Sequence, residues 1–311
     1  MMRFVLVALV VLSVACSRST DTPQDSAAAK TAPSSAAEST PAPSALWVVT
    51  EGIETPESAY VDPASGFIYV SQVAGAPDGR DGNGRIVKLD RKGTMVSATW
   101  VTGLNAPKGL RSCQGTLWTA DLDEVVGVNI ASGRITSRVK IVGAQFLNDV
   151  ACGAGGTVYV SDMLASRIHA IRNGAVSTFA EGEDLEYPNG LLVEGDRLIV
   201  GGWGKPEADF STKVPGRLYA LDLMTKQKTL ITPMPFANID GVESDGRGGY
   251  IVSDWVAGKI IHVMRGGESE VVAQFAPGTA DIGVIPDANT VVIPHMNDNR
   301  VAAYGLPEAF R

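Results

Sequence analysis

The sequence predicts an all-β fold, a six-bladed β-propeller with four strands in each blade. A phrase that opens with a polar residue and runs into a short apolar strand returns six times. The opening residues stand 40 to 51 residues apart, the length of one blade of short strands. They are Glu57, Lys108, Asn148, Asn189, Asp240 and Asp281. Because a propeller arranges its blades around one axis, these six positions should form one ring in space.

The rest of each repeat supplies the other strands of a blade. After the first strand comes an alternating β-branched run such as TVYVS (157–161), then a third strand such as SRIHAI (166–171). A fourth strand such as AVSTFA (175–180) closes five of the repeats, whereas the sixth repeat ends without one. The spare strand is ALWVV (45–49), so we expect it to pair with the last blade and close the ring, which removes exposed sheet edges.

The N-terminal part of the chain has the composition of an export signal and a tether. Residues 1–15 contain Arg3 and an apolar run that is too short to span a bilayer as a mature helix. Cys16 resembles the lipidated cysteine of a bacterial lipoprotein; the alternative is an ordinary cleaved signal. Residues 16–44 are Ser, Thr, Ala and Pro-rich, as in a flexible linker. We therefore expect an exported, lipid-anchored protein of the cell envelope, with the propeller at 45–311.

Charge and cysteine content narrow the function classes. The net charge is −8 and no basic stripe is present, which argues against nucleic-acid binding. The same charge gives no attraction to an anionic membrane, so we expect membrane contact only through the lipid. We expect a monomer. Cys113 and Cys152 fall near the ends of the first strands of adjacent blades. An oxidising envelope would allow a disulfide between them, and the alternative is two small buried side chains.

Four ring residues form a set of oxygen donors with two negative charges. Glu57 and Asp240 offer carboxylates, and Asn148 and Asn189 offer amide oxygens. Hard cations prefer such donors, Ca²⁺ first and then Mg²⁺ or Mn²⁺; Zn²⁺, which favours His and Cys, is the last option. The alternative is that these residues only stabilise strand starts and turns between blades.

The segments PES (56–58), NDV (148–150), PNGL (188–191), DGV (240–242) and SDW (253–255) resemble the senescence-marker/gluconolactonase family. The resemblance covers residues 45–311 and implies a six-bladed propeller with a central divalent metal. It implies that Glu57, Asn148, Asn189 and Asp240 hold the metal. It also implies hydrolysis of a lactone or related ester, a small-molecule substrate, with Asp240 as the base.

Two ring positions depart from that family. Lys108 would place an ammonium beside a cation, which costs roughly 1 kcal/mol at 4 Å in water and more in a dry site. Three alternatives follow: an ion pair between Lys108 and Asp281, a Lys108 side chain that points away, or a lysine that replaces the metal. Lys108 is also a candidate for substrate binding, and Asp281 for assisting catalysis.

A second circle should come from the ends of the second strands. Its candidates for substrate binding are Asp121, Asp162, Trp203 and Asp254, and its candidate for acid–base work is His295. For the aspartates the alternative is to stabilise the following turn, and for His295 a hydrogen-bonded structural role. The long loops 73–84 and 203–215 should overhang the same face.

Two functions of different class fit these features. The first is an envelope-anchored, metal-dependent lactone or ester hydrolase. The second is a non-catalytic propeller that binds a peptide, glycan or protein, since propellers host many functions. A third is a metal-free propeller that resembles strictosidine synthase.

Overall fold

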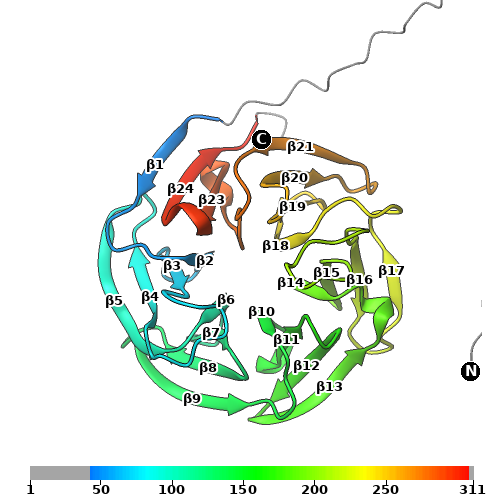
Figure 1. Ribbon diagram of the computed structural model, residues 1–311, viewed down its shortest axis with the longest axis horizontal. Coiled ribbons are helices and arrows are strands. Elements are labelled where there is room, and N and C mark those ends of the chain that lie inside the picture. The colour runs from blue at the N-terminus through cyan, green and yellow to red at the C-terminus, as the bar shows by residue number, and fades with distance from the viewer. Residues whose placement is uncertain (1–42, 308–311) are drawn as a thin grey trace, which may run out of the picture. The chain divides into compact units, whose positions relative to one another are not determined.

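The structure, a computed structural model, describes residues 43–307 as six antiparallel sheets around an axis (Figure 1). Each sheet has four strands, which confirms the predicted six-bladed β-propeller. The predicted signal, Cys16 and most of the linker lie outside the described residues. No helix within 43–307 is long and apolar enough to cross a membrane.

The strands of each blade follow one another outward from the axis. Blade 1 contains β2 (Pro56–Val61), β3 (Ile68–Gln72), β4 (Gly84–Leu89) and β5 (Met95–Leu104). Blade 2 contains β6 (Pro107–Cys113), β7 (Thr116–Asp121), β8 (Glu124–Asn129) and β9 (Arg134–Lys140). Blade 3 contains β10 (Leu147–Cys152), β11 (Val158–Asp162), β12 (Arg167–Arg172) and β13 (Ala175–Glu181).

The second half of the ring repeats this order until the last blade. Blade 4 contains β14 (Pro188–Glu194), β15 (Arg197–Gly202), β16 (Leu218–Asp222) and β17 (Lys228–Leu230). Blade 5 contains β18 (Ile239–Ser244), β19 (Tyr250–Asp254), β20 (Lys259–Val263) and β21 (Ser269–Gln274). Blade 6 contains β22 (Gly283–Ile285), β23 (Thr290–His295), β24 (Arg300–Gly305) and β1 (Ala45–Val49). Short 3-10 turns lie at Ala154–Gly156, Glu183–Leu185, Pro286–Ala288 and Met296–Asp298.

The N-terminal strand closes the ring as predicted. β1 pairs antiparallel with β24, with Val49 opposite Val301 and Val48 opposite Ala302. The last blade therefore joins strands from the two ends of the described chain (Figure 1). This pairing covers the edge that β24 would otherwise expose.

The hydrophobic core lies between neighbouring blades. Between blades 1 and 2, for example, Tyr69 and Ile86 pack in one cluster with Leu110 and Leu117, and each of the four is at most 1% exposed. Such a cluster forms because each blade must bury an apolar face on each neighbour. The innermost strands contact one another around the axis, so their first residues are held close together.

Candidate functional site

A β-bulge sits at the ring position in each of the first five blades. The register of the innermost strand shifts between Pro56 and Ala59 in blade 1, and at the equivalent place in blades 2 to 5. A bulge leaves a residue unpaired and re-aims its side chain. The repeated polar residue is thus directed toward the axis by the local backbone.

Serines of the second strands fix several of these bulges. The Ser71 hydroxyl accepts the backbone N–H of Ser58, Ser161 accepts that of Asp149, and Ser253 accepts that of Gly241, at 2.8 to 2.9 Å. These serines come from the recurring YVSQ, YVSD and IVSD segments. The repeated serine thus satisfies a buried donor that the bulge removes from the ladder.

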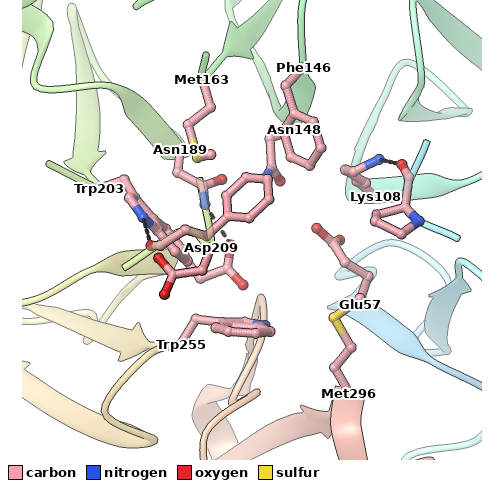
Figure 2. Close-up of a pocket in the computed structure, with 13 residues that line it drawn as sticks. Glu57, Lys108, Phe146, Asn148, Met163, Asn189, Trp203, Asp209, Trp255 and Met296 are labelled. Carbon is pink, nitrogen blue, oxygen red and sulfur yellow. Dashed lines mark hydrogen bonds between the residues drawn. The ribbon is translucent and has the colours of Figure 1, made fainter. Parts of the chain in front are cut away.

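Five of the six ring residues line one cavity of ≈180 Å³ (Figure 2). They are Glu57, Lys108, Asn148, Asn189 and Asp240. All five are buried, with exposures between 1% and 7%. The structure therefore brings together the four oxygen donors that the resemblance implies as metal ligands.

The carboxylates of the ring are crowded and poorly solvated. Burial raises the pKa of Glu57 well above its usual value, and Asp240 and Asp281 raise it further. Burial and the charge of Asp281 likewise raise the pKa of Asp240, although the Asn189 amide donates to Asp240 Oδ1 at 2.8 Å and opposes the shift. Buried like charges are costly unless a cation compensates them.

Two oxygen atoms of the ring residues that line the cavity have no hydrogen-bond partner. Glu57 Oε2 and Asn189 Oδ1 are both buried and unsatisfied. Within residues 43–307, no three His, Cys, Asp or Glu side chains converge as metal ligands would. The predicted set is of another kind, because amides supply half of its donors. Unpaired oxygens of this type fit a hard divalent cation such as Ca²⁺ or Mg²⁺.

Lys108 lines the cavity, but its ammonium is directed to backbone carbonyls and not to the ring carboxylates. Its Nζ donates to the carbonyl oxygens of Pro77 at 3.1 Å and Ala106 at 3.2 Å, and lies 4.8 Å from the centre of the Phe146 ring (Figure 2). Burial lowers the pKa of Lys108, while Glu57 acts to raise it. Of the three alternatives for this lysine, the structure contains the one in which its ammonium points away.

Asp281 does not line the cavity and makes no ion pair with Lys108 in the described structure. The Ser58 hydroxyl donates to its Oδ2 at 2.5 Å. Blade 6 has a similar one-residue shift, between the Thr279–His295 bridge and the Gly283–Val292 pair. It differs in that the backbone N–H of Asp281 donates to Glu57 O and that of Ala59 donates to Asp281 O. This pairing with blade 1 holds Asp281 beside the cavity, where its charge still acts on Glu57 and Asp240. Its assisting role stays a prediction.

His295 is buried between blades 5 and 6 and does not line the cavity. Its Nε2 lies 3.0 Å from the Tyr304 hydroxyl, and its ring packs edge-on against Phe275. Burial, followed by the charge of Arg300, lowers its pKa to about 4. Along a strand, His295 shares a face with Ile293, which belongs to the core between these blades. The structural alternative for this histidine is the one observed.

The three aspartates expected to bind substrate stabilise turns. Asp121 accepts the backbone N–H groups of Asn105 and Ala106, and Asp162 accepts those of Gln145 and Phe146. Asp254 accepts the N–H of Ala257 at 2.9 Å. None of them lines the cavity. In blades 2 and 3 the carboxylate thus holds the segment that enters the ring strand.

Aromatic and sulfur-containing side chains form the walls of the cavity (Figure 2). Trp203, predicted to contact substrate, lies 6.2 Å from Trp255 between ring centres. Its indole N–H donates to the carbonyl of Phe210 at 3.0 Å, which ties loop 203–215 to the cavity. Pro77 brings in loop 73–84, so both long loops overhang this face, as expected.

Several wall residues could not be anticipated from the repeat. Phe146, Met163, Phe210 and Met296 line the cavity, yet they stand in turns or loops outside the aligned strands. Only Phe146 could have been suspected from the sequence, because it lies two residues before Asn148, in the segment that enters a ring strand.

A different set of charges lies at the other end of the propeller axis, away from the cavity. Arg111 Nη1 lies 2.8 Å from Glu243 Oε1 and joins blade 2 to blade 5 across the axis. Burial alone would lower the pKa of Arg111, but Glu243 and Asp149 outweigh it. Burial raises the pKa of Asp149 to about 7, although Arg111 and two backbone N–H groups act against this shift.

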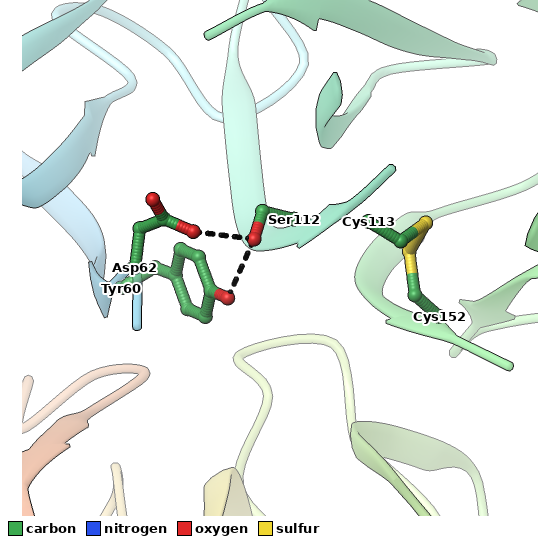
Figure 3. Close-up of a disulfide and its surroundings, with 5 residues drawn as sticks. All are labelled: Tyr60, Asp62, Ser112, Cys113 and Cys152. Atoms are coloured by element: carbon green, nitrogen blue, oxygen red, sulfur yellow. Dashed lines mark hydrogen bonds between the residues drawn. A yellow bond between two sulfur atoms is a disulfide. The ribbon is translucent and has the colours of Figure 1, made fainter. Parts of the chain in front are cut away.

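A disulfide joins blades 2 and 3 near that end (Figure 3). Cys113 and Cys152 are the last residues of β6 and β10, and their Cα atoms are 6.0 Å apart. Beside it, the Ser112 hydroxyl donates to Asp62 at 2.6 Å and lies 2.9 Å from the Tyr60 hydroxyl. These contacts connect three consecutive blades.

Comparisons with known proteins support the fold. No protein-family model and no curated protein sequence matches the chain. A gluconolactonase from Xanthomonas campestris is 15% identical with a TM-score of 0.60, covering 85% of this chain and 89% of that one. A streptogramin B lyase is 11% identical with a TM-score of 0.58, covering 84% and 98%. A virginiamycin B lyase from Staphylococcus aureus is 13% identical with a TM-score of 0.52, covering 80% and 78%. At these identities the similarity establishes a shared propeller fold.

Proposed function

We propose that the cavity hydrolyses a lactone or related ester with the help of a divalent cation. The observation that carries the proposal is a pair of buried, unpartnered oxygens, Glu57 Oε2 and Asn189 Oδ1. The raised pKa values of Glu57 and Asp240 support it. The similarity of fold to a gluconolactonase supports the same class of reaction.

In this proposal Glu57, Asn148, Asn189 and Asp240 hold the cation, with Ca²⁺ as the first choice. When bound, it would polarise the substrate carbonyl. Asp240 takes a proton from the attacking water as the ring C–O bond breaks, and the products are a carboxylic acid and an alcohol. Asn189 orients Asp240 through its 2.8 Å hydrogen bond.

The departing alkoxide also needs a proton. Lys108 lines the cavity and uses two of its three N–H donors on Pro77 and Ala106, so one donor remains for the leaving oxygen. We assign Lys108 this role within the proposal. Export and lipidation at Cys16 remain predictions from the sequence alone.

Metal analysis and turnover of a lactone panel test the proposal together. We expect about one divalent ion per chain, and loss of turnover on chelation. Glu57→Gln and Asp240→Asn should each lower kcat/KM by about 100-fold or more, because each removes a ligand or the base. Glu54→Gln is a matched control, because this glutamate is paired with Arg85 and does not line the cavity.

A chain that binds no divalent ion and turns over no lactone or ester would contradict the proposal. Such a result would favour the non-catalytic binding protein. Full turnover in Glu57→Gln and Asp240→Asn would equally exclude this site as the active site.

A further inference from the structure

The walls and the floor of the cavity differ in chemistry. Above the ring, the walls are carbon and sulfur surfaces from both long loops and three blades (Figure 2). The wall residues are Pro77, Phe146, Met163, Trp203, Phe210, Trp255 and Met296. The polar side chains gather at the ring, apart from Asp209, which is exposed at the mouth.

The wall side chains offer few polar atoms, and one of these is already used. The Trp203 indole N–H donates to Phe210 O, and the remaining wall side chains carry no strong hydrogen-bonding group except the Trp255 N–H. A ligand rich in hydroxyls would lose its water partners here and find few replacements. Each buried hydroxyl without a partner lowers affinity by roughly tenfold.

The size of the cavity limits the ligand. Its volume is ≈180 Å³, close to that of an engineered apolar cavity of about 150 Å³ that holds a benzene ring. A single six-membered ring with a small substituent therefore fits between the aromatic walls. Rings in two pairs, Trp203 with Trp255 and Phe146 with Phe210, present edges and faces to such a ligand.

We infer that the substrate is a small lactone or ester whose reacting carbonyl faces the ring and whose remainder is hydrocarbon. A polyhydroxylated sugar lactone does not match the walls. This inference rests on the proposed function for the reaction, and on the walls for the substrate class. Trp203, Trp255, Phe146 and Phe210 are the residues that determine specificity.

A matched pair of six-membered lactones tests the substrate class. δ-Hexalactone carries a methyl group, whereas glucono-δ-lactone carries hydroxyls on the same reacting ring. With the full chain and saturating Ca²⁺, we expect kcat/KM for δ-hexalactone to exceed that for gluconolactone by about 100-fold or more. Equal or faster turnover of gluconolactone would overturn the inference and leave the proposed hydrolase intact.

A binding measurement separates the substrate class from the reaction. δ-Valerolactam has the same ring with an amide in place of the ester, so it reports binding without turnover. We expect it to change the tryptophan fluorescence, and gluconolactam to do so only at about 100-fold higher concentration. Selective binding of δ-valerolactam without hydrolysis of either lactone would contradict the proposed hydrolase and support the apolar ligand class. Absence of both binding and turnover would sink both.

Variants of the walls provide the control. Trp255→Gln introduces polar groups and should reduce the preference for δ-hexalactone by about tenfold, whereas Trp255→Phe should retain it. Trp118→Phe is the matched control, because Trp118 packs against the core between blades 2 and 3 and does not line the cavity. A preference unchanged in Trp255→Gln, with unchanged thermal unfolding, would overturn the assignment of the walls.

Discussion

The two ends of the central channel treat buried acids in opposite ways. At the opposite end, Arg111 from blade 2 crosses the axis to Glu243 at 2.8 Å, and its charge also acts on Asp149. At the cavity end, Glu57 and Asp240 are more deeply buried than Glu243, but the nearest ring cation, Lys108, is directed to backbone carbonyls instead.

This difference separates acids that are compensated within the fold from acids that are not. A fold that can place an arginine among buried carboxylates at one end could have placed a cation at the other. Leaving Glu57 Oε2 without a partner costs stability, and such costs concentrate at functional sites. The cavity end is thus the one that suits a bound cation.

Breaking the charge pair at the opposite end should have the largest effect on stability. Arg111→Met leaves the largely buried Glu243 without its partner; the two side chains are 11% and 15% exposed. We expect a loss of about 3 to 5 kcal/mol in the free energy of unfolding, measured with denaturant.

The double variant Arg111→Met/Glu243→Leu is the control for that change. It removes both charges, so most of the lost stability should return. Equal destabilisation in the single and double variants would show that packing of the arginine, and not its charge, matters at this end of the channel.

Removing the disulfide should have an intermediate effect. Cys113 and Cys152 are 39 residues apart, so their bond restricts the unfolded chain. Cys113→Ser/Cys152→Ser should cost about 2 to 4 kcal/mol in denaturant unfolding. Divalent-cation affinity should change little, because the disulfide lies at the other end of β6 and β10 from the ring. Further loss when a reductant is added to this variant would contradict that cause.

The smallest effect expected is a dependence of stability on pH in the cation-free protein. Glu57, Asp240 and Asp281 have a raised pKa, and that of Asp149 is about 7. Between pH 5 and 8 these four carboxyl groups hold protons in the folded protein that the unfolded chain has released, so their contribution to stability falls as pH rises. His295, whose pKa is lowered to about 4, acts in the opposite direction below about pH 6.5, but it is one group against four. We expect Tm in chelator to decline by roughly a few °C over this window.

Saturating Ca²⁺ should flatten that decline, because it compensates the ionised ring carboxylates. Asp149→Asn should flatten it in part without added cation. A Tm that rises from pH 5 to 8 in chelator would mean that these carboxyl groups are ionised at little cost.

The sequence was sufficient for the fold because the repeat and the strand pattern agree. Six polar residues at blade spacing, each followed by β-branched alternation, leave few other architectures. Even the closing strand 45–49 could be found, since blade 6 lacked a fourth strand. The ring was predictable for the same reason: equivalent positions of a repeat become neighbours around the axis.

The rest of the site depends on features that a repeat does not encode. Phe146 and Phe210 reach the cavity through the path of a turn and a loop, which no alignment of strands specifies. Asp281 aligned with the ring but pairs its backbone with blade 1, and His295 aligned with a rim position but faces the core. Alignment gives the order of the residues, whereas bulges and side-chain direction decide which of them share a cavity.

The pairing of β1 with β24 has a consequence for how the chain acquires this fold. Ala45 is synthesised long before its partner Tyr304. Until the last blade emerges, β1 has no strand to pair with, and Trp47 and Val49 lack the part of their core that Val301 and Ala303 supply. Contacts between such distant parts of a chain form slowly, and exposed strand edges invite aggregation meanwhile. We therefore expect the incomplete ring, and not the closed one, to be the state that is prone to aggregation.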